Sequence, residues 1–518
     1  MILALFYVAA SGFIALSYEI MWFRIYAHVS GGTAHVFGIM LSAYLLGLAT
    51  GSLAARWFCT ETQGINNRSL LTIPATTLLL VSILGFLFVP FVAHFVTYFH
   101  YAWTLILVAV LAGLMGIIFP LIAHFALLVN QLTGKRLSWL YLSNILGATT
   151  GSLLTGFVFL DILTFQGVSL LLTFIGVLLA AMLFVHSGQR GVTLVGILFF
   201  CTLVMIAAGM RASPLYSDLW EKLQYKTDYS NDKQFIQIIE NRSGVITVDD
   251  KGTVYGDGIW DGKFNTTLLR HLNYIERAYV ISGIHPAPKS VLIVGLGSGS
   301  WAQVIGHIPT VEKMTIVEIN PGYLEVVKSN EQVRSLLTNP KVDIVIDDGR
   351  RWLRANPDKM FDAIIQNTTY HWRSHATNLL SMEYQALIKQ HLKPGGLSMF
   401  NATDFAPAMK TACTAFQHGF RFINNMIVSD TEIYIHPDLW RERLENYQID
   451  GHPIFNLDRE QDRIRLEEVL KLKDRPGGWA GEVWVEPCNE ILQRTASDPL
   501  VTDDNMAPEL YRPWWALP

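Results

Sequence analysis

Charged residues are scarce in this chain of 518 residues, where Asp, Glu, Lys and Arg together make up 16%. An average soluble domain has about 25%. The formal net charge is −4, so the sequence lacks the surplus of basic residues that nucleic-acid-binding proteins carry. It also lacks internal repeats and the His and Cys spacings of metal sites. We therefore expect neither nucleic acid nor a metal ion as a ligand.

Cysteine is rare as well, with four residues in the whole chain. Cys59 and Cys201 lie in an apolar first half, and Cys413 and Cys488 lie in a more polar second half. The second pair could form a disulfide in an oxidising compartment or stay reduced in the cytoplasm. The sequence leaves both states open, and a disulfide between them would support a position outside the cytoplasm.

Long apolar runs are abundant before residue 210, and almost all of the apolar excess of the chain lies there. Seven runs approach the length of about 20 residues that crosses a hydrocarbon core. The first run lacks a basic start, so we interpret it as a retained span and not as a cleaved signal. We predict a multi-pass membrane domain over residues 1–210. The predicted spans are Ile2–Tyr26, Ala34–Phe58, Leu70–Phe95, Ala102–Val129, Trp139–Leu163, Val168–Val185 and Val192–Met210.

Helix-breaking and ionisable residues interrupt some of these runs. Pro74 and Pro90 lie in the third run, which is also compatible with a broken or re-entrant segment. Glu19 and Arg24 lie near one end of the first run and could form an interfacial ion pair. The alternative for Glu19 is a polar path or substrate-facing cavity, because an ionisable group at membrane depth is costly unless it faces protein or water.

Small residues recur at four-residue spacing inside the runs, as in Gly47 with Gly51 and Gly147 with Gly151. Such pairs let the backbones of membrane helices approach each other closely. We expect helix packing contacts at both pairs.

The second half contains three short apolar runs that end on glycines or acids. Continuous apolar runs of this length are typical of buried strands in a parallel sheet. The carboxyl ends of such strands form the ligand-binding edge of open α/β folds. The runs and their ends are Val291–Val294 with Gly295, Gly297 and Gly299, Met314–Val317 with Glu318, and Ile344–Ile346 with Asp347 and Asp348.

The residues at these strand ends fit an adenosine-type ligand. The glycines allow close approach of backbone N–H groups to a nucleoside. Glu318 follows the loop by about 20 residues, where an acid can bind both hydroxyls of a ribose. Asp348 is placed to accept from the exocyclic amine of adenine. Each signal is weak alone, and their order along the chain carries the prediction.

The composition of the second half suggests three parts. Residues 211–283 are expected to hold a linker, a β-hairpin region and a helix, residues 284–440 a Rossmann-like domain, and residues 441–518 an extension that covers the sheet or returns to the bilayer surface. The elements expected before the sheet are strands at Phe235–Ile239, Val245–Val248 and Thr253–Tyr255, and a helix at Leu268–Ser282.

Several stretches share the pattern of one known family. They are Tyr255–Gly262 (YGDGIWDG), Pro286–Ser300 (PAPKSVLIVGLGSGS), Val317–Asn320 (VEIN), Asp347–Gly349 (DDG), Leu392–Gly396 (LKPGG) and Val501–Asn505 (VTDDN), with Tyr18–Arg24, Gly116–Pro120 and Asn144–Gly147 in the apolar half. By these stretches the chain resembles the polyamine aminopropyltransferases, the spermidine synthase family, and most closely their membrane-fused, multi-pass members.

The resemblance implies a class I methyltransferase-like fold that binds S-adenosylmethionine or its decarboxylated form as co-substrate. The family's usual reaction moves an aminopropyl group from the sulfonium to an amine of putrescine. Because a sulfonium is a good leaving group, the protein mainly positions the nucleophile and removes its proton.

The chain departs from the family at the fourth strand. The family's aspartate there, which accepts the proton of the attacking amine, is replaced by Asn367 beside the donor site, and an amide cannot act as a base. Arg373 would repel a polyammonium chain, so the acceptor is expected not to be putrescine. His371 is the replacement base or a packing residue, Asp261 is a further candidate acid, and Tyr370 could stack on adenine.

Two functions of different classes remain. The first is a membrane-bound transferase with an S-adenosyl donor and a small-molecule or lipid-soluble acceptor; a methyltransferase or a sulfonium lyase would share its pocket. The second is a transporter or sensor in which the helices do the work and the nucleoside-binding domain is catalytically silent. Neither specifies the acceptor, the group moved or the oligomeric state.

The basic residues of the loops predict an orientation in the cell membrane. With seven spans, the positive-inside rule places the N-terminus in the cytoplasm and the second half outside. An S-adenosyl donor is made in the cytoplasm, so the two arguments conflict, and an error of one span would remove the conflict. The counted residues are Arg56, Arg68, Lys135, Arg136 and Arg190 on the N-terminal side, against Arg24 and Arg211 on the other.

Overall fold

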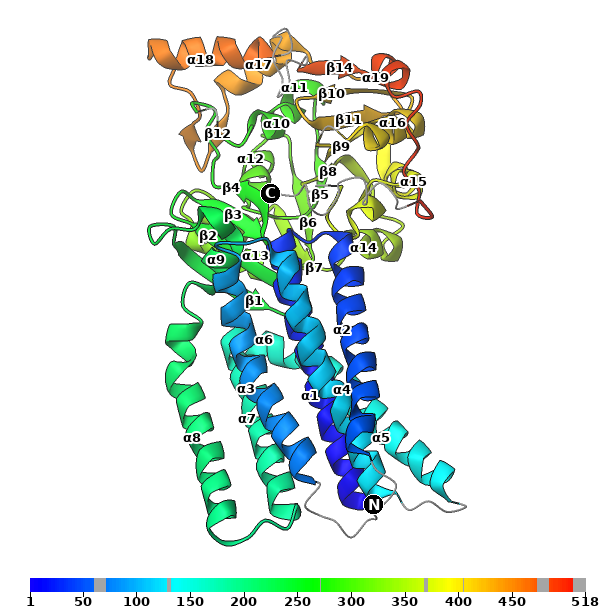
Figure 1. The fold of residues 1–518 in the computed structure, drawn as a ribbon. Helices are drawn as coiled ribbons and strands as arrows, with labels where there is room; N and C mark the ends of the chain where they lie inside the picture. The colour runs from blue at the N-terminus through cyan, green and yellow to red at the C-terminus, as the bar shows by residue number, and fades with distance from the viewer. Residues whose placement is uncertain are drawn as a thin grey trace. The chain divides into compact units, whose positions relative to one another are not determined.

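The computed structural model describes residues 1–59, 71–127, 132–270, 272–367, 371–403, 405–472 and 484–505 (Figure 1). The chain divides into two compact units. The first comprises Met1–Phe235 with Ile239–Val245, and the second comprises Ile236–Ile238 with Ile246–Pro518. The division thus passes through the first two strands of the chain.

The first unit is helical. Seven of its described helical segments are long and apolar enough to cross a membrane, so the predicted helices are confirmed as helices of that length and composition. Short 3-10 or π turns extend some of them at their ends. The helices are α1 (Ile2–Ser30), α2 (Ala34–Ala54), α3 (Thr72–Phe95), α4 (Leu105–Ala126), α5 (Thr133–Leu154), α6 (Leu160–Ile162), α7 (Phe165–His186) and α8 (Gly191–Leu215).

The third span is one continuous helix, α3, so the alternative of a broken or re-entrant segment is wrong. Pro74 lies in the first turn of α3, where its missing N–H would have no intrahelical partner in any case. Pro90 lies in the helix interior and removes one hydrogen bond there, yet α3 continues to Phe95.

The glycine pairs lie where helix backbones meet, as expected. A Cβ atom on Gly147 of α5 would lie 1.9 Å from the carbonyl oxygen of Ala9 in α1. A Cβ atom on Gly51 of α2 would lie 1.8 Å from the carbonyl oxygen of Gly113 in α4. Both distances are far inside van der Waals contact, so any larger residue would push these helices apart.

Glu19 and Arg24 do not form the expected ion pair among the described residues. Arg24 instead donates through Nη1 and Nη2 to the carbonyl oxygens of Asn241 and Arg242, at 2.6 Å each. Residues five positions apart point in directions roughly 140° apart around a helix, because each residue turns the helix by about 100°. The prediction failed because it considered depth in the membrane and not this angle.

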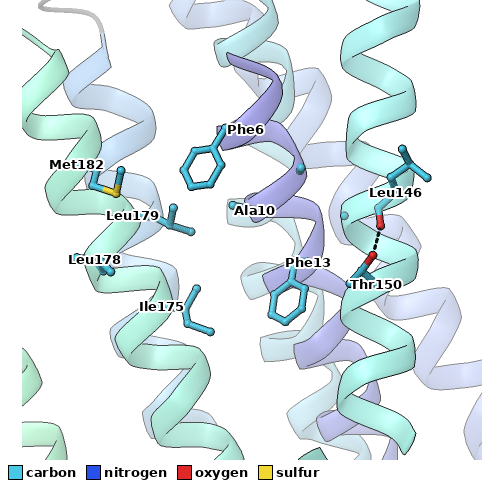
Figure 2. Close-up of a pocket in the computed structure, with 11 residues that line it drawn as sticks. Phe6, Ala10, Phe13, Leu146, Thr150, Ile175, Leu178, Leu179 and Met182 are labelled. Carbon is cyan, nitrogen blue, oxygen red and sulfur yellow. Dashed lines mark hydrogen bonds between the residues drawn. The ribbon is translucent and has the colours of Figure 1, made fainter. Parts of the chain in front are cut away.

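Helices α1, α5 and α7 border an apolar groove of about 520 Å³. Figure 2 shows Phe6 and Phe13 of α1 between side chains of α5 and α7. The hydroxyl of Thr150 donates to the carbonyl oxygen of Leu146 at 2.8 Å, so this polar group of the lining is satisfied within its own helix (Figure 2).

The segment between the apolar helices and the sheet is more helical than expected at its start and less helical at its end. Residues 211–232 include the last turn of α8 and a further helix, α9 (Leu219–Tyr225). The helix expected at Leu268–Ser282 is wrong: only α10 (Glu276–Tyr279) and α11 (Ile281–Ile284) form. Asn273 and Tyr274 have φ angles of 62° and 45°, which a right-handed helix cannot accommodate.

A four-stranded sheet has the order β1-β2-β3-β4. Its first three strands confirm the predicted hairpin region, and the fourth was not predicted as a strand. The pairs β2–β3 and β3–β4 are antiparallel. The bounds are β1 (Phe235–Asn241), β2 (Gly244–Asp249), β3 (Thr253–Gly256) and β4 (Ile259–Lys263).

The main sheet of the second unit has eight strands in the order β14-β10-β11-β9-β8-β5-β6-β7. The five strands from β9 to β7 are parallel to their neighbours, and β11, β10 and β14 are antiparallel. The strands are β5 (Ser290–Val294), β6 (Lys313–Glu318), β7 (Val342–Ile346), β8 (Phe361–Gln366), β9 (Leu392–Asn401), β10 (His418–Phe422), β11 (Asn425–Ser429) and β14 (Val485–Pro487).

The strand order reverses direction at β5, which pairs with β6 on one side and with β8 on the other. Such a switch point creates a crevice at the carboxyl ends of the strands. The intervening helices are α12 (Ser300–Gly306), α13 (Gly322–Ser329), α14 (Gly349–Ala355), α15 (Met382–Gln390), α16 (Ala406–Ala415), α17 (Pro437–Glu445), α18 (Glu460–Leu470) and α19 (Cys488–Arg494).

Cys413 of α16 and Cys488 of α19 form a disulfide. The sequence left this pairing open. The bond connects positions 75 residues apart and ties the end of the described chain to the helices beside the sheet. Nearby, Asp503 accepts from Arg350 at 2.8 Å and from Ser381 at 2.7 Å, which anchors the predicted closing segment. Among the C-terminal tryptophans, Trp479, Trp514 and Trp515 lie outside the described residues.

Candidate functional site

The predicted nucleoside-binding residues meet at one edge of the main sheet. Strands β5, β6 and β7 are adjacent and pair in register, with Val294 opposite Val317 and Glu318 opposite Ile346. The backbone N–H of Asp347 donates to the carbonyl oxygen of Glu318 at 3.0 Å. Three neighbouring strand ends are therefore followed by the predicted binding residues. These are the glycine loop (Gly295–Gly299) after β5, Glu318 at the end of β6, and Asp347 with Asp348 after β7.

The glycines of the first loop are required by its backbone. Gly297 has φ of 52°, and a Cβ atom there would lie 2.8 Å from the carbonyl oxygen of Asp261. Gly299 has φ of 76°, and a Cβ atom there would lie 2.7 Å from a methyl group of Val327. Positive φ and close neighbours both exclude a side chain, as predicted for a loop that approaches a ligand with its backbone.

Glu318 is buried and oriented by the loop. Its Oε2 accepts from the backbone N–H of Leu296 at 2.7 Å, and its Oε1 accepts from that of Asn320 at 2.8 Å. Burial raises the pKa of the Glu318 carboxyl to about 7, although both hydrogen bonds favour the charged form. Each carboxylate oxygen can accept a second hydrogen bond, so the group can still bind a pair of hydroxyls.

The two aspartates have different local partners. Asp348 Oδ1 accepts from the backbone N–H of Arg351 at 2.7 Å and caps α14. Asp347 Oδ1 accepts from Nε of Arg351 at 2.6 Å. Asp348 thus combines a structural cap with a second oxygen that has no hydrogen-bond partner among the described residues, whereas Asp347 is held in an ion pair.

A small cavity of about 40 Å³ lies beside the glycine loop. It brings together Asp261, Asn367 and Arg373, three residues singled out from the sequence. The lining residues are Trp260, Asp261, Gly262, Asn273, Arg277, Ser298, Trp301, Asn367, Arg373 and Asn401.

Asp261 is the acidic residue of this lining. Its Oδ2 accepts from the hydroxyl of Tyr323, and its Oδ1 lies 3.4 Å from Nη1 of Arg373. Burial disfavours the charge on Arg373, but the carboxylate of Asp261, assisted by Asp257 and Glu318, outweighs this effect and raises the pKa of the guanidinium. The cavity lining therefore contains a partly buried anion and a partly buried cation side by side.

The predicted base His371 does not line this cavity among the described residues. Its ring stacks on Phe405, with centroids 3.8 Å apart and an interplanar angle of 8°, and it meets the edge of Trp372. This geometry favours the packing interpretation, while its role as a base stays a prediction. The backbone N–H of Asn367 donates to the carbonyl oxygen of Val294 at 3.0 Å, and Tyr370 lies outside the described residues.

Sequence reasoning missed five residues of the site: Asn273, Arg277, Trp301, Tyr323 and Asn401. Tyr323 is the second residue of α13, directly after the acid motif, so its position after a parallel strand was a usable signal. Asn273 and Arg277 fall in the stretch interpreted as an ordinary helix. The sequence pattern does not predict the turn at Asn273. A sequence interpreted as one continuous helix therefore gives no reason to place Arg277 in a pocket.

Comparisons with known proteins find similar sequences for part of this chain. Residues 278–434 match the family model of the spermine/spermidine synthase domain. The polyamine aminopropyltransferase of Mycobacterium tuberculosis is 34% identical over 135 residues, which is 24% of this chain and 26% of the relative. The spermidine synthase of Dictyostelium discoideum is 32% identical over 136 residues, which is 25% of this chain and 47% of the relative.

The similarity covers a limited part of each protein. This chain spans about a quarter to a half of the length of these curated relatives. A spermidine synthase solved in complex with the transition state analogue AdoDATO aligns with a TM-score of 0.36 at 19% identity, over 46% of this chain and 89% of that chain. The match over residues 278–434 confirms the resemblance to the spermidine synthase family for this part of the chain.

Proposed function

We propose that the protein is a membrane-anchored transferase that binds an S-adenosyl donor at the edge of its main sheet and transfers an alkyl group to an acceptor other than a polyamine. In this reaction a nucleophile forms a bond to a carbon on the sulfonium while the carbon–sulfur bond breaks. The electron pair stays on sulfur as a neutral thioether, and the nucleophile loses a proton. The adjacency of the glycine loop, Glu318 and Asp348 carries the proposal.

The comparisons support transferase chemistry. The matched relatives are named polyamine aminopropyltransferase and spermidine synthase, and the family uses decarboxylated S-adenosylmethionine as its aminopropyl donor. In this chain the bound nucleoside would contact the loop backbone, with the ribose on Glu318 and the adenine on Asp348. The protein's own contribution is then to orient the sulfonium carbon toward the acceptor.

The lining of the cavity argues against a polyamine acceptor. Arg277 and Arg373 both line it, and Asn367 replaces the family's aspartate. Two unit charges about 5 Å apart repel by about 3 kcal/mol at an effective dielectric constant of about 20. Asp261 offsets part of this repulsion for one ammonium group, but a diamine would place a second one among the guanidinium groups. We infer a neutral or anionic acceptor.

Two observations support a position of the second unit outside the cytoplasm. The positive-inside count favours it, and the disulfide between Cys413 and Cys488 is the state expected in an oxidising compartment. The seven apolar helices would hold the protein in the membrane. The donor would then have to reach an extracytoplasmic pocket.

The same facts keep a second candidate, a transporter or sensor with a catalytically silent nucleoside-binding unit. Asn367 cannot take a proton, and His371 is stacked outside the cavity lining. Radiolabelled nucleoside flux into proteoliposomes, without covalent change of the nucleoside, would favour this candidate over a transferase.

The test uses full-length protein in detergent and methylthioadenosine, which contains the shared nucleoside part of every S-adenosyl donor. Calorimetry should detect binding, and Glu318→Gln should weaken it about 10- to 100-fold, because it replaces a charged acceptor of the ribose hydroxyls. Glu331→Gln is the matched control, since Glu331 has a side chain 86% exposed in a surface pair. Absence of methylthioadenosine binding, or equal binding by both variants, would contradict the proposal.

Product analysis then separates the reactions. Protein incubated with labelled donor and a membrane extract should release methylthioadenosine if a propyl-type group is transferred, and S-adenosylhomocysteine if a methyl group is transferred. Binding without either product would favour the silent nucleoside-binding unit.

A further inference from the structure

We propose that Gln366 recognises the adenine base by donating a hydrogen bond from its Nε2 to a ring nitrogen beside the adenine amine. This inference rests on the proposed function, because it concerns the nucleoside of that same site. It names a residue that determines the specificity for adenine in addition to Asp348.

Gln366 is the polar member of an otherwise apolar row at the carboxyl edge of the main sheet. It ends β8 and pairs with Val294 of β5 on one side and with Phe400 of β9 on the other. Val294 in turn pairs with Val317 of β6. Paired residues of neighbouring strands point to the same face of a sheet, so these four side chains share one face. The row therefore places one amide among two valines and a phenylalanine.

The amide of Gln366 is buried without a partner. The residue is 2% exposed, and its Nε2 has no hydrogen-bond partner among the described residues. A buried donor in this state destabilises the protein that contains it. A ligand that brings an acceptor to Nε2 would remove this cost when it binds.

Two contacts place this face of the sheet against the start of α14, where Asp348 lies. A Cβ atom on Gly349, the first residue of α14, would lie 2.5 Å from Cγ1 of Val294, the neighbour of Gln366. Tyr384 of α15 belongs to the same apolar cluster as Val294. Burial raises the pKa of the Tyr384 hydroxyl, and the charge of Asp348 raises it further. Gln366 and Asp348 therefore lie on the same side of the sheet edge.

Together the two groups match the hydrogen-bonding pattern of adenine. The second oxygen of Asp348 can accept from the exocyclic amine, and the two ring nitrogens that flank this amine, N1 and N7, are acceptors. Nε2 of Gln366 can supply the donor for one of them. Hypoxanthine has a carbonyl oxygen in place of the amine, and this oxygen would face the carboxylate of Asp348 without a hydrogen bond. The pair therefore selects adenine against a base with the inverted pattern.

Binding requires the nucleoside edge to open. Glu318, the residue assigned to the ribose, is 4% exposed, so it is covered in the structure about as completely as Gln366. An amide without a partner makes the closed edge less stable than an edge closed by apolar side chains alone. Gln366 therefore lowers the free energy that the nucleoside must supply to open the edge.

The test measures binding to full-length protein in detergent by calorimetry. The ligands are methylthioadenosine and its 1-deaza, 3-deaza and 7-deaza analogues, in each of which one ring nitrogen is replaced by CH. In the native protein we expect the 1-deaza or the 7-deaza analogue to bind about 10-fold more weakly than methylthioadenosine, because one hydrogen bond is lost. The 3-deaza analogue lacks the nitrogen remote from the amine and should bind within about threefold of methylthioadenosine.

Gln366→Met is the matched variant, because methionine has the length of glutamine and no donor. It should bind methylthioadenosine about 10-fold more weakly and should no longer distinguish it from the sensitive deaza analogue. Gln366→Leu repeats the measurement with a second apolar side chain. Ser398→Ala is the control, since the Ser398 hydroxyl is equally buried without a partner among the described residues, but pairs with Ile364, deeper in the sheet. It should retain both the affinity and the discrimination.

Stability provides a readout that a purely structural role of Gln366 would not give. Without ligand, Gln366→Met should unfold at a temperature equal to or above that of the native protein, because it removes a donor that has no partner. A lower Tm would contradict the unbonded donor on which the inference depends. Equal binding of all four nucleosides to the native protein, or discrimination that persists in both variants, would overturn the inference and leave the proposed function standing. Failure of methylthioadenosine itself to bind would contradict the proposed function.

Discussion

Nucleoside binding should strengthen with pH because of the environment of Glu318. Burial raises the pKa of this carboxyl to about 7, and the N–H groups of Leu296 and Asn320 offset only part of that effect. Ribose hydroxyls donate hydrogen bonds to an ionised carboxylate more strongly than to a protonated one. The bound state therefore favours ionised Glu318, and binding at low pH must first remove a proton.

The size of the effect follows from the titration. With a pKa of about 7, roughly one tenth of Glu318 is ionised at pH 6 and roughly nine tenths at pH 8. If only the ionised form binds well, the Kd for methylthioadenosine should fall about tenfold between these pH values. Calorimetry at pH 6, 7 and 8 measures this directly, with Glu318→Gln as the control whose weaker binding should not follow the same curve. A Kd that is constant, or that rises toward pH 8, would refute the reasoning.

The raised pKa of Glu318 strengthens nucleoside binding as pH rises, but it lowers the stability of the ligand-free protein as pH rises. In the unfolded chain the carboxyl titrates near its ordinary value of 4.5, so between pH 4.5 and about 7 the folded state holds a proton that the unfolded state has released. The contribution of protonated Glu318 is present below pH 4.5 and is lost as pH rises through 7. Between pH 5.5 and 7.5, Tm should fall more in the native protein than in Glu318→Gln.

Three substitutions test other parts of the structure. Cys488→Ser should lower the free energy of unfolding by up to about 4.5 kcal/mol, because the bond closes a loop of 75 residues, and equal denaturation midpoints with and without reductant would contradict the disulfide. Gly297→Ala should abolish methylthioadenosine binding, since its Cβ would lie 2.8 Å from a carbonyl oxygen at φ of 52°; unchanged calorimetric affinity would contradict the loop geometry. Gly147→Leu should lower the yield of folded protein in detergent, because even a Cβ would lie 1.9 Å from Ala9 O, whereas Gly134→Leu, with open space at its Cβ, should not.

The residues of the nucleoside edge could be predicted because a parallel sheet imposes a simple pattern. Strands buried on both faces are continuous apolar runs, and their carboxyl ends meet at one edge. The runs that end at Gly295, Glu318 and Asp347 were therefore expected at one edge of a sheet, and the structure has them on three adjacent strands. The apolar helices followed from length and hydrophobicity in the same way.

The cavity could not be predicted because it depends on backbone turns and long-range contacts. Asn273 adopts φ of 62° and interrupts the expected helix before α10, the short helix that contains Arg277 of the cavity lining. Arg277 is then fixed by Asn424, which lies 147 residues away in the sequence. The stacking of His371 on Phe405 is likewise a contact between distant segments. Local periodicity contains no signal for any of these.

The position of the nucleoside can be seen in a structure of the full-length protein with bound methylthioadenosine. We expect the nucleoside at the carboxyl ends of β5, β6 and β7, with both ribose hydroxyls about 3 Å from the carboxylate of Glu318 and the adenine amine within hydrogen-bonding distance of Asp348. A nucleoside bound elsewhere, or the same edge closed by side chains at saturating ligand, would contradict it.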